Sequence, residues 1–349
     1  MKKNYKKILS LHKKNEHISL ALHQWKWKNN NNSLLKVKID RPLIPKINIQ
    51  DIDPSVFIFN HHFKWPFYIE AMTGGSSLSK KINCQLATIS RKYNLAMAVG
   101  SESIAINNND PDIKGSFSIV RKKNPHGFIL ANIGANHNLK EAKEAIKIIN
   151  ANALEIHLNT VQELSSRNGD RIFKNYQNNI KEIIQGLKIP VIIKEVGFGM
   201  SKDKIHNLSL LHPAAINIAG NDGTDFGSIE ERRNRPRLWP IKKDKNTNTF
   251  FSLTSNKILG ISTLKSLQFA KEAKIKTPII ANGGINNTLE VFNAMATGAK
   301  MVGIAGYFLS QLNKNKLKQT IINWQRQLPL LYGIYNIQKS SQISHLKKL

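Results

Sequence analysis

The sequence is poor in cysteine, in acidic residues and in long apolar runs. Cys84 is the single cysteine among 349 residues, so the chain cannot build an internal disulfide framework or a cysteine-based zinc site. The N-terminus is basic without the apolar core of a signal peptide, and no stretch reaches the roughly 18 apolar residues of a membrane span. We therefore expect a cytoplasmic protein, in a reducing compartment and without membrane contact. We also expect a homo-oligomer, although no sequence feature indicates its size.

Acidic residues are too few to balance the basic ones. The chain has 52 Lys and Arg against 23 Asp and Glu, which gives a formal net charge of +29. Such a charge ordinarily favours a nucleic-acid or membrane-surface partner. The lysines are spread along the chain among many Ile and Asn residues, however, and compositional drift would produce the same excess. Because no helix-turn-helix, zinc-finger or RNP-like motif is present, we expect no nucleic-acid partner. Binding of a small polyanion fits the charge.

Short apolar runs recur from Phe67 onward and alternate with segments of helical spacing. The eight runs are Phe67 to Glu70, Leu95 to Val99, Gly127 to Ala131, Ala153 to Ile156, Val191 to Lys194, Ala215 to Ile218, Pro278 to Ala281 and Met301 to Ile304. Continuous apolar runs are typical of parallel strands that are buried on both faces. The sequence therefore predicts an α/β protein with a (β/α)8 TIM barrel. A doubly wound open sheet is the rival, but no GxGxxG motif follows the first run.

Segments of different composition flank and interrupt the barrel. Residues 1–64, with three prolines, predict an irregular N-terminal extension that partly covers the barrel of residues 65–325. Residues 326–349 would form a basic C-terminal tail. The connection 221–260 exceeds the ~12–15 residues of ordinary loops, and we expect Lys242 to Asn248 within it to be mobile. The same connection carries a charged cluster, namely Glu230, Glu231, Arg232, Arg233, Arg235 and Arg237.

Polar and small residues follow the apolar runs, where a barrel builds its active site. They are Ala71 to Gly75, Gly100-Ser101, Asn132, His157 to Asn159 with Gln162 and Glu163, Lys194-Glu195, Gly223-Thr224, Gly283-Gly284 and Ala305-Gly306. Glycines after strands seven and eight allow backbone N–H groups to approach a phosphate at a helix N-terminus. The two glycine tips together predict a phosphate site, although a Gly-Gly pair alone more often marks a turn.

Three of these side chains also have a purely structural interpretation. Lys194, in a buried strand, needs an acceptor, and we favour a ligand-facing role over pairing with Glu195. His157 is as compatible with a hydrogen-bonded core histidine as with a ligand contact. Glu163 could be a solvated carboxylate that offsets a helix dipole. The histidines at positions 12, 17 and 23 lack the spacing of an HExxH zinc helix.

Several of these motifs together resemble the type 2 isopentenyl-diphosphate isomerase family. The motifs are Lys13 to Ile18 (KKNEHI), Ala71 to Gly75 (AMTGG), Ile156 to Glu163 (IHLNTVQE), Lys194 to Gly199 (KEVGFG) and the closing GGI and AG tips. The similarity extends from about Lys13 to Leu309. The IHLNxxQE and KEVGFG motifs are specific, whereas the terminal glycine tips are shared by many FMN barrels.

The resemblance implies an isomerase that interconverts isopentenyl and dimethylallyl diphosphates in isoprenoid biosynthesis, with reduced FMN and Mg²⁺. NADPH would serve to reduce the flavin. The implied FMN-binding residues are Ala71, Met72, Thr73, Ser101, Asn132, Lys194, Thr224, Gly284, Ile285, Asn286, Ala305 and Gly306. The implied substrate-binding residues are Lys13, Lys14, His17, Ser101, His157, Asn159 and Gln162. Glu163 would bind the metal, and Gln162, Glu163 and His157 would be catalytic.

The chain departs from the family pattern at three places, and these departures bear on substrate binding. Lys13 stands where the family motif begins with arginine, so a two-pronged contact to phosphate is lost. Ser101-Glu102-Ser103 replaces the usual Ser-Gln-Arg, which removes a cation. Ala219 to Thr224 (AGNDGT) replaces Ser-Gly-Arg-Gly-Gly-Thr, which removes a hydroxyl and an arginine near the expected flavin. These changes are compatible with weaker diphosphate binding, with relaxed selection or with an altered substrate.

Two other functions remain as alternatives. An FMN-dependent α-hydroxy-acid oxidase or dehydrogenase has a similar barrel and similar phosphate tips, but it needs a histidine base near the end of strand six, where this chain has Ala219 to Asn221. A basic nucleic-acid-binding protein on a degenerate barrel is favoured by the net charge alone.

Overall fold

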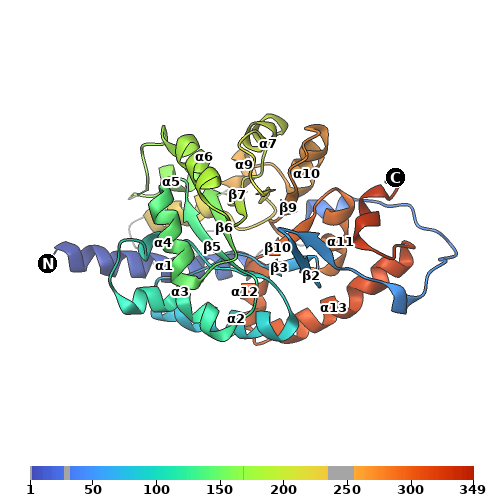
Figure 1. The fold of residues 1–349 in the computed structure, drawn as a ribbon, viewed down its shortest axis with the longest axis horizontal. Helices are drawn as coiled ribbons and strands as arrows, with labels where there is room; N and C mark the ends of the chain where they lie inside the picture. Colours follow the sequence, from blue (N-terminus) through green and yellow to red (C-terminus); the bar gives the residue numbers. More distant parts are fainter. Residues whose placement is uncertain (1, 27–31, 168, 235–254) are drawn as a thin grey trace, which may run out of the picture.

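Eight parallel strands form the centre of the molecule (Figure 1). The computed structural model describes residues 2–26, 32–167, 169–234 and 255–349. The strands are β3 (Phe67–Ile69), β4 (Met97–Ala98), β5 (Ile129–Gly134), β6 (Ala153–Leu158), β7 (Val191–Glu195), β8 (Ala215–Asn217), β9 (Ile279–Ala281) and β10 (Met301–Ile304). They pair in the order β10-β3-β4-β5-β6-β7-β8-β9 as a closed barrel. Each strand overlaps one of the eight apolar runs, so the predicted (β/α)8 barrel is confirmed.

Helices follow the strands and cover the outside of the barrel. The longer ones are α2 (Ser77–Tyr93), α3 (Pro111–Lys123), α4 (Leu139–Ile149), α6 (Tyr176–Gly186), α7 (Lys202–Ser209), α10 (Thr263–Glu272), α11 (Thr288–Ala296), α12 (Gly306–Asn313) and α13 (Leu317–Ile334). The remaining helices are α8 (Phe226–Asn234) and the shorter α5 (Thr160–Ser165) and α9 (Asn256–Leu259), with 3-10 turns η1 (Ser33–Lys36), η2 (Ile49–Asp51), η3 (Glu102–Ile104) and η4 (Ser340–His345). Local caps define many helix ends; Asn138 and Glu141, for example, form a capping box at the start of α4.

A small antiparallel hairpin closes the end of the barrel opposite the strand tips. It consists of β1 (Val56–Ile58) and β2 (His61–Phe63). Phe63 packs against Phe128, just before β5, with ring centroids 4.9 Å apart. This aromatic contact covers the start of the barrel strands, so the carboxyl-terminal end is the one left open for a ligand.

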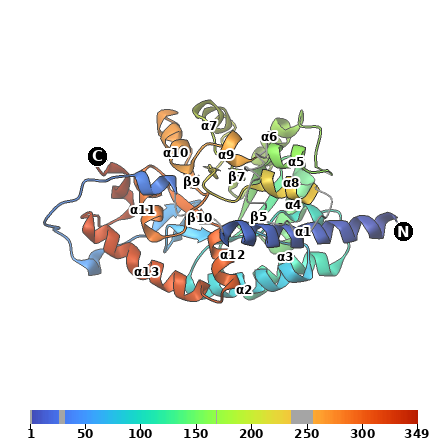
Figure 2. The same ribbon diagram turned by 180° about the vertical axis from the view of Figure 1, so that it is seen from behind.

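The N-terminal extension is helical where the sequence predicted irregular structure. Helix α1 (Lys2–Lys26) contacts α12, α8 and α2, and Figure 2 shows it crossing the barrel next to α12. Lys14, Ile18, Ala21 and Trp25 lie at helical spacing and line one pocket. The prediction of an irregular segment was therefore wrong for Lys2–Lys26, because this stripe of mixed character, with a lysine at its start, does not show ordinary apolar periodicity. From residue 32 to β1 the chain is irregular apart from η1 and η2.

The C-terminal segment is continuous with the barrel's outer helices. The predicted boundary at residue 326 lies within α13, whose Leu328 and Tyr332 are fully buried. An apolar helix face that packs on the core does not end where the composition becomes more basic. Further along, Lys348 forms an isolated antiparallel β-bridge with Ile39 of the N-terminal extension. The expected mobile stretch Lys242 to Asn248, with Arg235 and Arg237, lies outside the described residues.

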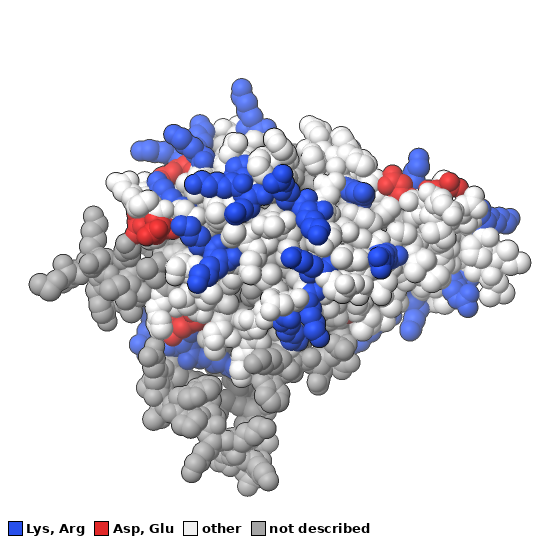
Figure 3. Space-filling view, turned by 90° about the horizontal axis from the view of Figure 1, so that it is seen from below, with Lys and Arg blue, Asp and Glu red and all other residues white. Residues whose placement is uncertain are grey.

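Basic side chains dominate one face of the molecule. Figure 3 shows this face, seen from below Figure 1, with many Lys and Arg and few Asp or Glu side chains. Helices α2, α3 and α13 contribute exposed basic residues to the surface of the molecule, namely Lys81, Arg91, Lys92, Lys122, Lys123, Lys318 and Arg326. Over the ranges that the structure describes, no helix is long and apolar enough to cross a membrane.

Candidate active site

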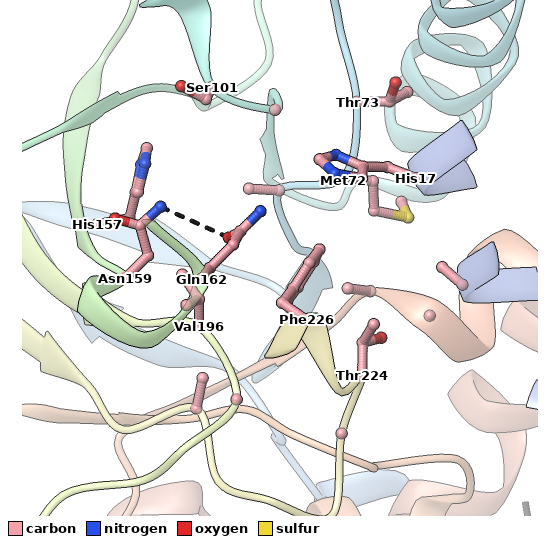
Figure 4. A pocket seen from close by; sticks show the side chains of 18 of the residues that line it. His17, Met72, Thr73, Ser101, His157, Asn159, Gln162, Val196, Thr224 and Phe226 are labelled. Atoms are coloured by element: carbon pink, nitrogen blue, oxygen red, sulfur yellow. Dashed lines mark hydrogen bonds between the residues drawn. The ribbon is translucent and has the colours of Figure 1, made fainter. Parts of the chain in front are cut away.

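A deep pocket of about 460 Å³ opens at the carboxyl ends of the barrel strands. Its lining includes nearly every site residue predicted from the sequence: Lys13, Lys14, His17, Ala71, Met72, Thr73, Ser101, Asn132, His157, Asn159, Gln162, Glu163, Lys194, Thr224, Gly284, Ile285, Ala305 and Gly306. Asn286 is not part of the lining, and its N–H donates to the Glu290 carboxylate at 2.6 Å. Figure 4 shows Gln162 and Phe226 projecting into the pocket between His157 and Asn159 on one side and His17 and Met72 on the other.

His157 is held by a hydrogen bond across two strands. The register of β5 and β6 pairs Asn132 with Glu155 and Gly134 with His157. Asn132 Nδ2 donates to Glu155 at 3.1 Å, so its Oδ1, 2.7 Å from His157 Nδ1, accepts the ring N–H. Burial, followed by the charges of Lys194, Lys14 and His137, lowers the pKa of His157 to about 3. The ring is therefore neutral at pH 7, with Nε2 as its unprotonated nitrogen.

Carboxyl groups lie buried inside the barrel beneath the pocket. Glu70 is 1% exposed, Glu155 is fully buried, and the Tyr68 hydroxyl lies between them, 2.8 Å from Glu70 Oε2 and 3.2 Å from Glu155 Oε1. Burial and the neighbouring charge of Glu70 raise the pKa of Glu155 well above its usual range. Burial therefore favours the protonated form of Glu155, next to the Glu70 carboxylate.

Lys194 supplies the positive charge that faces this carboxylate. Its Nζ lies 3.9 Å from Glu70 Oε1 and donates to the backbone carbonyl of Glu195 at 3.1 Å. The side-chain carboxylate of Glu195 instead accepts the N–H groups of Gly197 and Phe198. Burial raises the pKa of Glu195 to about 7 despite these N–H groups. Lys194 thus lines the pocket while its charge is balanced from below by Glu70.

Charged residues from α1 and α8 meet at the side of the pocket. His17 Nε2 lies 2.7 Å from Glu230 Oε1, Lys13 Nζ lies 3.9 Å from the same oxygen, and Arg233 pairs with the other oxygen. Burial opposes ionisation of Glu230, but the His17 hydrogen bond, followed by the positive charges around it, outweighs burial and lowers the pKa of Glu230 to about 2. Burial also lowers the pKa of His17, so at pH 7 its hydrogen bond matters more to Glu230 than its charge. The sequence showed Glu230 only within a charged cluster, and nothing in that pattern distinguished it from its neighbours.

Lys14, the next residue of α1, contacts a different part of the pocket lining, at Ser101. Its Nζ donates to the backbone carbonyl of Ser101 at 3.3 Å. Burial and the charge of Lys13 lower the pKa of Lys14 to about 8, while Glu163 acts in the opposite direction. The two lysines therefore place positive charge at the pocket mouth from adjacent helix positions.

Glu163 is oriented by neighbours on its own loop. Asn159 Nδ2 donates to one carboxylate oxygen at 2.8 Å, and the Asp170 N–H donates to the other at 2.9 Å. Each carboxylate oxygen retains a lone pair for another ligand. Within the described ranges, no group of three or more His, Cys, Asp or Glu residues is arranged to hold a metal ion. A cation here would need oxygen ligands from a bound molecule and water as well as Glu163.

Glycine is required directly after β9, the seventh barrel strand, because the backbone there lies close to the loop that follows β8. Gly283 and Gly284 have φ values of +104° and +80°. A Cβ on Gly283 would lie 2.4 Å from the Gly220 carbonyl oxygen, and one on Gly284 would lie 2.3 Å from that of Asp222. The neighbouring Asp222 carboxylate accepts the Ser33 hydroxyl at 2.6 Å, so this tip also anchors the N-terminal extension. The bare backbone of the two glycines remains open to the pocket.

Glu102 is a buried acid that the sequence did not mark as a site residue. Its Oε2 accepts the Asn132 N–H at 3.1 Å, and Oε1 has no hydrogen-bond partner among the described residues. Burial raises the pKa of Glu102 well above its usual range. Glu102 is therefore a neutral acid and resembles the glutamine expected at this position in size and hydrogen bonding.

The closed barrel and its polar pocket at the carboxyl-terminal end define an enzyme of the (β/α)8-barrel class. No protein-family model matches the chain. The chain is 40% identical to the isopentenyl-diphosphate delta-isomerase of Lactococcus lactis over 349 residues, which cover 97% of this chain and 95% of that protein. It is 35% identical to the enzyme of the same name from Listeria monocytogenes, over 97% of this chain and 90% of that protein. The chain belongs to the isopentenyl-diphosphate delta-isomerase family, as the sequence motifs predicted.

Solved structures of similar fold are flavin enzymes of different chemistry. A mandelate oxidase variant matches with a TM-score of 0.61 at 10% identity, over 96% of this chain and 90% of that one. The flavin-binding domain of baker's yeast flavocytochrome b2 matches with a TM-score of 0.59 at 13% identity, over 90% of this chain and 76% of that one. At such low identity these matches show a shared fold and no more.

Proposed function

We propose that this protein interconverts isopentenyl and dimethylallyl diphosphates, using reduced FMN and Mg²⁺. The observation that carries the proposal is the convergence of the family's IHLNxxQE and KEVGFG motifs on one pocket, where Asn159, Gln162, Glu163 and Lys194 all line the same cavity. The family membership described above supports the same activity.

The barrel end fits a flavin mononucleotide. A cofactor phosphate would meet the bare backbone of Gly283 and Gly284 and the start of α12 at Gly306. The isoalloxazine ring would lie on the small or apolar side chains of the β3 tip, Ala71 and Met72, with Lys194 on its polar edge. Reduced FMN, when bound, supplies ring nitrogens that exchange a proton with the alkene and an electron-rich face beside the developing positive charge. NADPH is the proposed reductant.

The substrate diphosphate would lie at the entrance formed by α1 and the β6 tip. Lys13 and Lys14 contribute positive charge there, while the neutral His157 contributes hydrogen-bonding capacity and no charge. The isoprene unit would extend inward past Gln162 towards the apolar side chains of the β3 tip, Ala71 and Met72. A reacting alkene in this part of the pocket is removed from bulk water, which protects a carbocation-like transition state from capture.

Glu163 is the proposed metal ligand. Its carboxylate is held in place from both sides by Asn159 and Asp170, and one or two carboxylates with phosphate oxygens and water suit Mg²⁺. Gln162, one residue earlier, contacts Asn159 at 3.5 Å and Glu230 at 3.4 Å. This amide would orient the isoprene unit beside the flavin while Glu163 and the metal hold the diphosphate.

The test begins with the visible spectrum of the purified protein, because oxidised flavin absorbs visible light. The protein is then reduced anaerobically with dithionite or NADPH and given isopentenyl diphosphate with Mg²⁺. Formation of dimethylallyl diphosphate with no net consumption of reductant is the expected result. A protein that binds no FMN, or that binds FMN and leaves isopentenyl diphosphate unchanged, would contradict the proposal.

An α-hydroxy-acid oxidase is the second candidate, and the fold neighbours are of that kind. The oxidase chemistry needs a histidine base after the sixth barrel strand, β8, where Ala219 lines the pocket instead. Consumption of oxygen with lactate or mandelate would support this candidate. The nucleic-acid alternative rests on net charge, and heparin retention without a yellow chromophore would support it. Cytoplasmic location and homo-oligomer formation stay predictions.

A further inference from the structure

Three side chains from two separate segments form a continuous hydrogen-bonded row at the pocket rim. Ser103 Oγ, on η3, lies 2.8 Å from His137 Nε2, and His137 Nδ1 lies 3.1 Å from Glu141 Oε2, on α4. Ser103 Oγ also lies 2.9 Å from Ser101 Oγ. Both serines line the pocket, whereas His137 is only 8% exposed and lies behind them. The row therefore connects the buried His137 and its half-buried carboxylate partner Glu141 to hydroxyl groups that face the pocket.

Glu141 determines which ring nitrogen carries the proton. Its carboxylate is fixed by the Asn138 N–H at 3.0 Å and by Asn107 Nδ2 at 3.2 Å. A carboxylate accepts, so the facing nitrogen, Nδ1 of His137, donates. Nε2 then has two states. In the neutral ring it accepts the hydroxyl proton of Ser103, and in the imidazolium it donates to the Ser103 oxygen.

These two states have opposite consequences for an anion in the pocket. When the ring is neutral, the single proton of Ser103 is directed to His137, and the hydroxyl presents lone pairs that repel a phosphate oxygen. When the ring is protonated, Ser103 is free to donate towards the pocket, and a positive charge stands directly behind it. An anion at Ser103 therefore stabilises the imidazolium, and the imidazolium strengthens anion binding by the same factor.

We propose that Ser101, Ser103, His137 and Glu141 form a subsite for the diphosphate group, in which protonated His137 acts through Ser103 as the cation of this corner. The inference rests on the proposed function for the identity of the substrate. It explains how the chain can bind a diphosphate although Ser103 stands where the family pattern has an arginine. Ser103 is the contacting group, and His137 and Glu141 are positioning residues.

Other titratable groups face this row from the elements packed around it. Lys14 on α1 donates to the Ser101 carbonyl, and His157 on β6 interacts electrostatically with His137. Glu102 on η3 is held neutral by burial. Glu144 on α4 accepts from Asn107 and Lys114. Glu141 is the carboxylate in direct contact with the ring, so it supplies the main compensation for a charge on His137.

The experiment measures binding of inorganic pyrophosphate with Mg²⁺ to the FMN-loaded protein, by calorimetry between pH 6 and 8.5. The wild type is compared with His137→Gln, whose amide keeps a hydrogen-bond donor but no charge, and with the exposed His126→Gln as a control. At pH 6 we expect binding to His137→Gln to be weaker by roughly ten-fold, a difference that shrinks by pH 8.5. Titration of pyrophosphate itself is common to all three proteins and cancels in the comparison.

Ser103→Ala provides a second test, because it leaves the His137–Glu141 pair untouched. We expect Ser103→Ala to weaken pyrophosphate binding several-fold. In the Ser103→Ala background, adding His137→Gln should then change pyrophosphate binding little. In turnover with isopentenyl diphosphate, both variants should raise KM with little change in kcat. Binding by His137→Gln equal to wild type at pH 6 would overturn the subsite. If pyrophosphate shows the expected pattern while isopentenyl diphosphate is not isomerised, the subsite stands and the proposed reaction fails.

Discussion

His17 and Glu230 are 213 positions apart in the chain, yet His17 Nε2 lies 2.7 Å from Glu230 Oε1. The contact joins α1 to α8 beside the pocket, and Arg233 strengthens it by binding both Glu230 and Glu16. Glu230 is fully buried, so its charge needs these partners. The pair therefore holds the helix that carries Lys13 and Lys14 against the barrel.

Glu230→Gln should destabilise the protein in a pH-dependent way. The pKa of Glu230 is lowered to about 2 in the folded protein, from an ordinary value of 4.5. A lowered acid pKa stabilises the fold above the ordinary value, and this contribution is lost as the pH falls towards 2. Urea unfolding should show a cost of up to about 3 kcal/mol at pH 7, clearly smaller at pH 3. The exposed Glu182→Gln is the control. An equal cost at both pH values would show that the charge of Glu230 is not the source.

Lys194→Ala should weaken FMN retention by roughly ten-fold or more, because it removes a buried ammonium from the pocket wall. The FMN dissociation constant is measured by flavin fluorescence, with the exposed Lys202→Ala as a control. The substitution also leaves the Glu70 carboxylate buried without its cation. The double variant Lys194→Ala with Glu70→Gln separates the two effects, since it should recover stability without recovering flavin. Unchanged FMN affinity in Lys194→Ala would contradict the assignment.

Glu163→Gln should keep the flavin and lose most of the isomerase turnover together with its Mg²⁺ dependence. Glutamine preserves the size of the side chain and an acceptor oxygen for Asn159, but it is a poor ligand for a hard cation. Turnover is measured over a Mg²⁺ titration, and FMN content is read from the absorbance spectrum. A wild-type rate that EDTA does not change would show that the metal role is wrong.

Ser103→Arg should lower the KM for isopentenyl diphosphate with little change in kcat. The wild type lacks the bidentate guanidinium expected here, and a charge-assisted hydrogen bond contributes roughly 1.5–3 kcal/mol, so its KM should be high by about ten-fold or more. The wild-type KM should also rise with ionic strength, because salt screens the diffuse positive field over ~8 Å. If His137 supplies charge through Ser103, the improvement should be smaller at pH 6 than at pH 8. A KM that stays unchanged or rises at pH 8 would mean that other cations already form the pocket, or that the substrate is a different one.

The fold and most of the pocket lining could be predicted from the chain alone. A strand buried on both faces must be apolar throughout, so the eight barrel strands are visible as uninterrupted runs such as Val191 to Lys194. The carboxyl ends of parallel strands meet at one end of a barrel, so residues as distant as Thr73 and Thr224 were expected in one pocket. Of the predicted site residues, Asn286 alone lies outside the lining, and its N–H donates to Glu290.

The tertiary structure decided which polar groups meet, and therefore which charge each one carries. One side of helix α1 lines the pocket. The residues on this side are mixed in polarity, and their role as pocket wall depends on the barrel end against which they pack. Glu230 became a buried carboxylate through His17, and His137 met Ser103 from a different βα unit. Hydrophobic periodicity is a local property that the sequence displays directly, whereas pairing and desolvation of charged groups depend on contacts between segments that the sequence holds far apart.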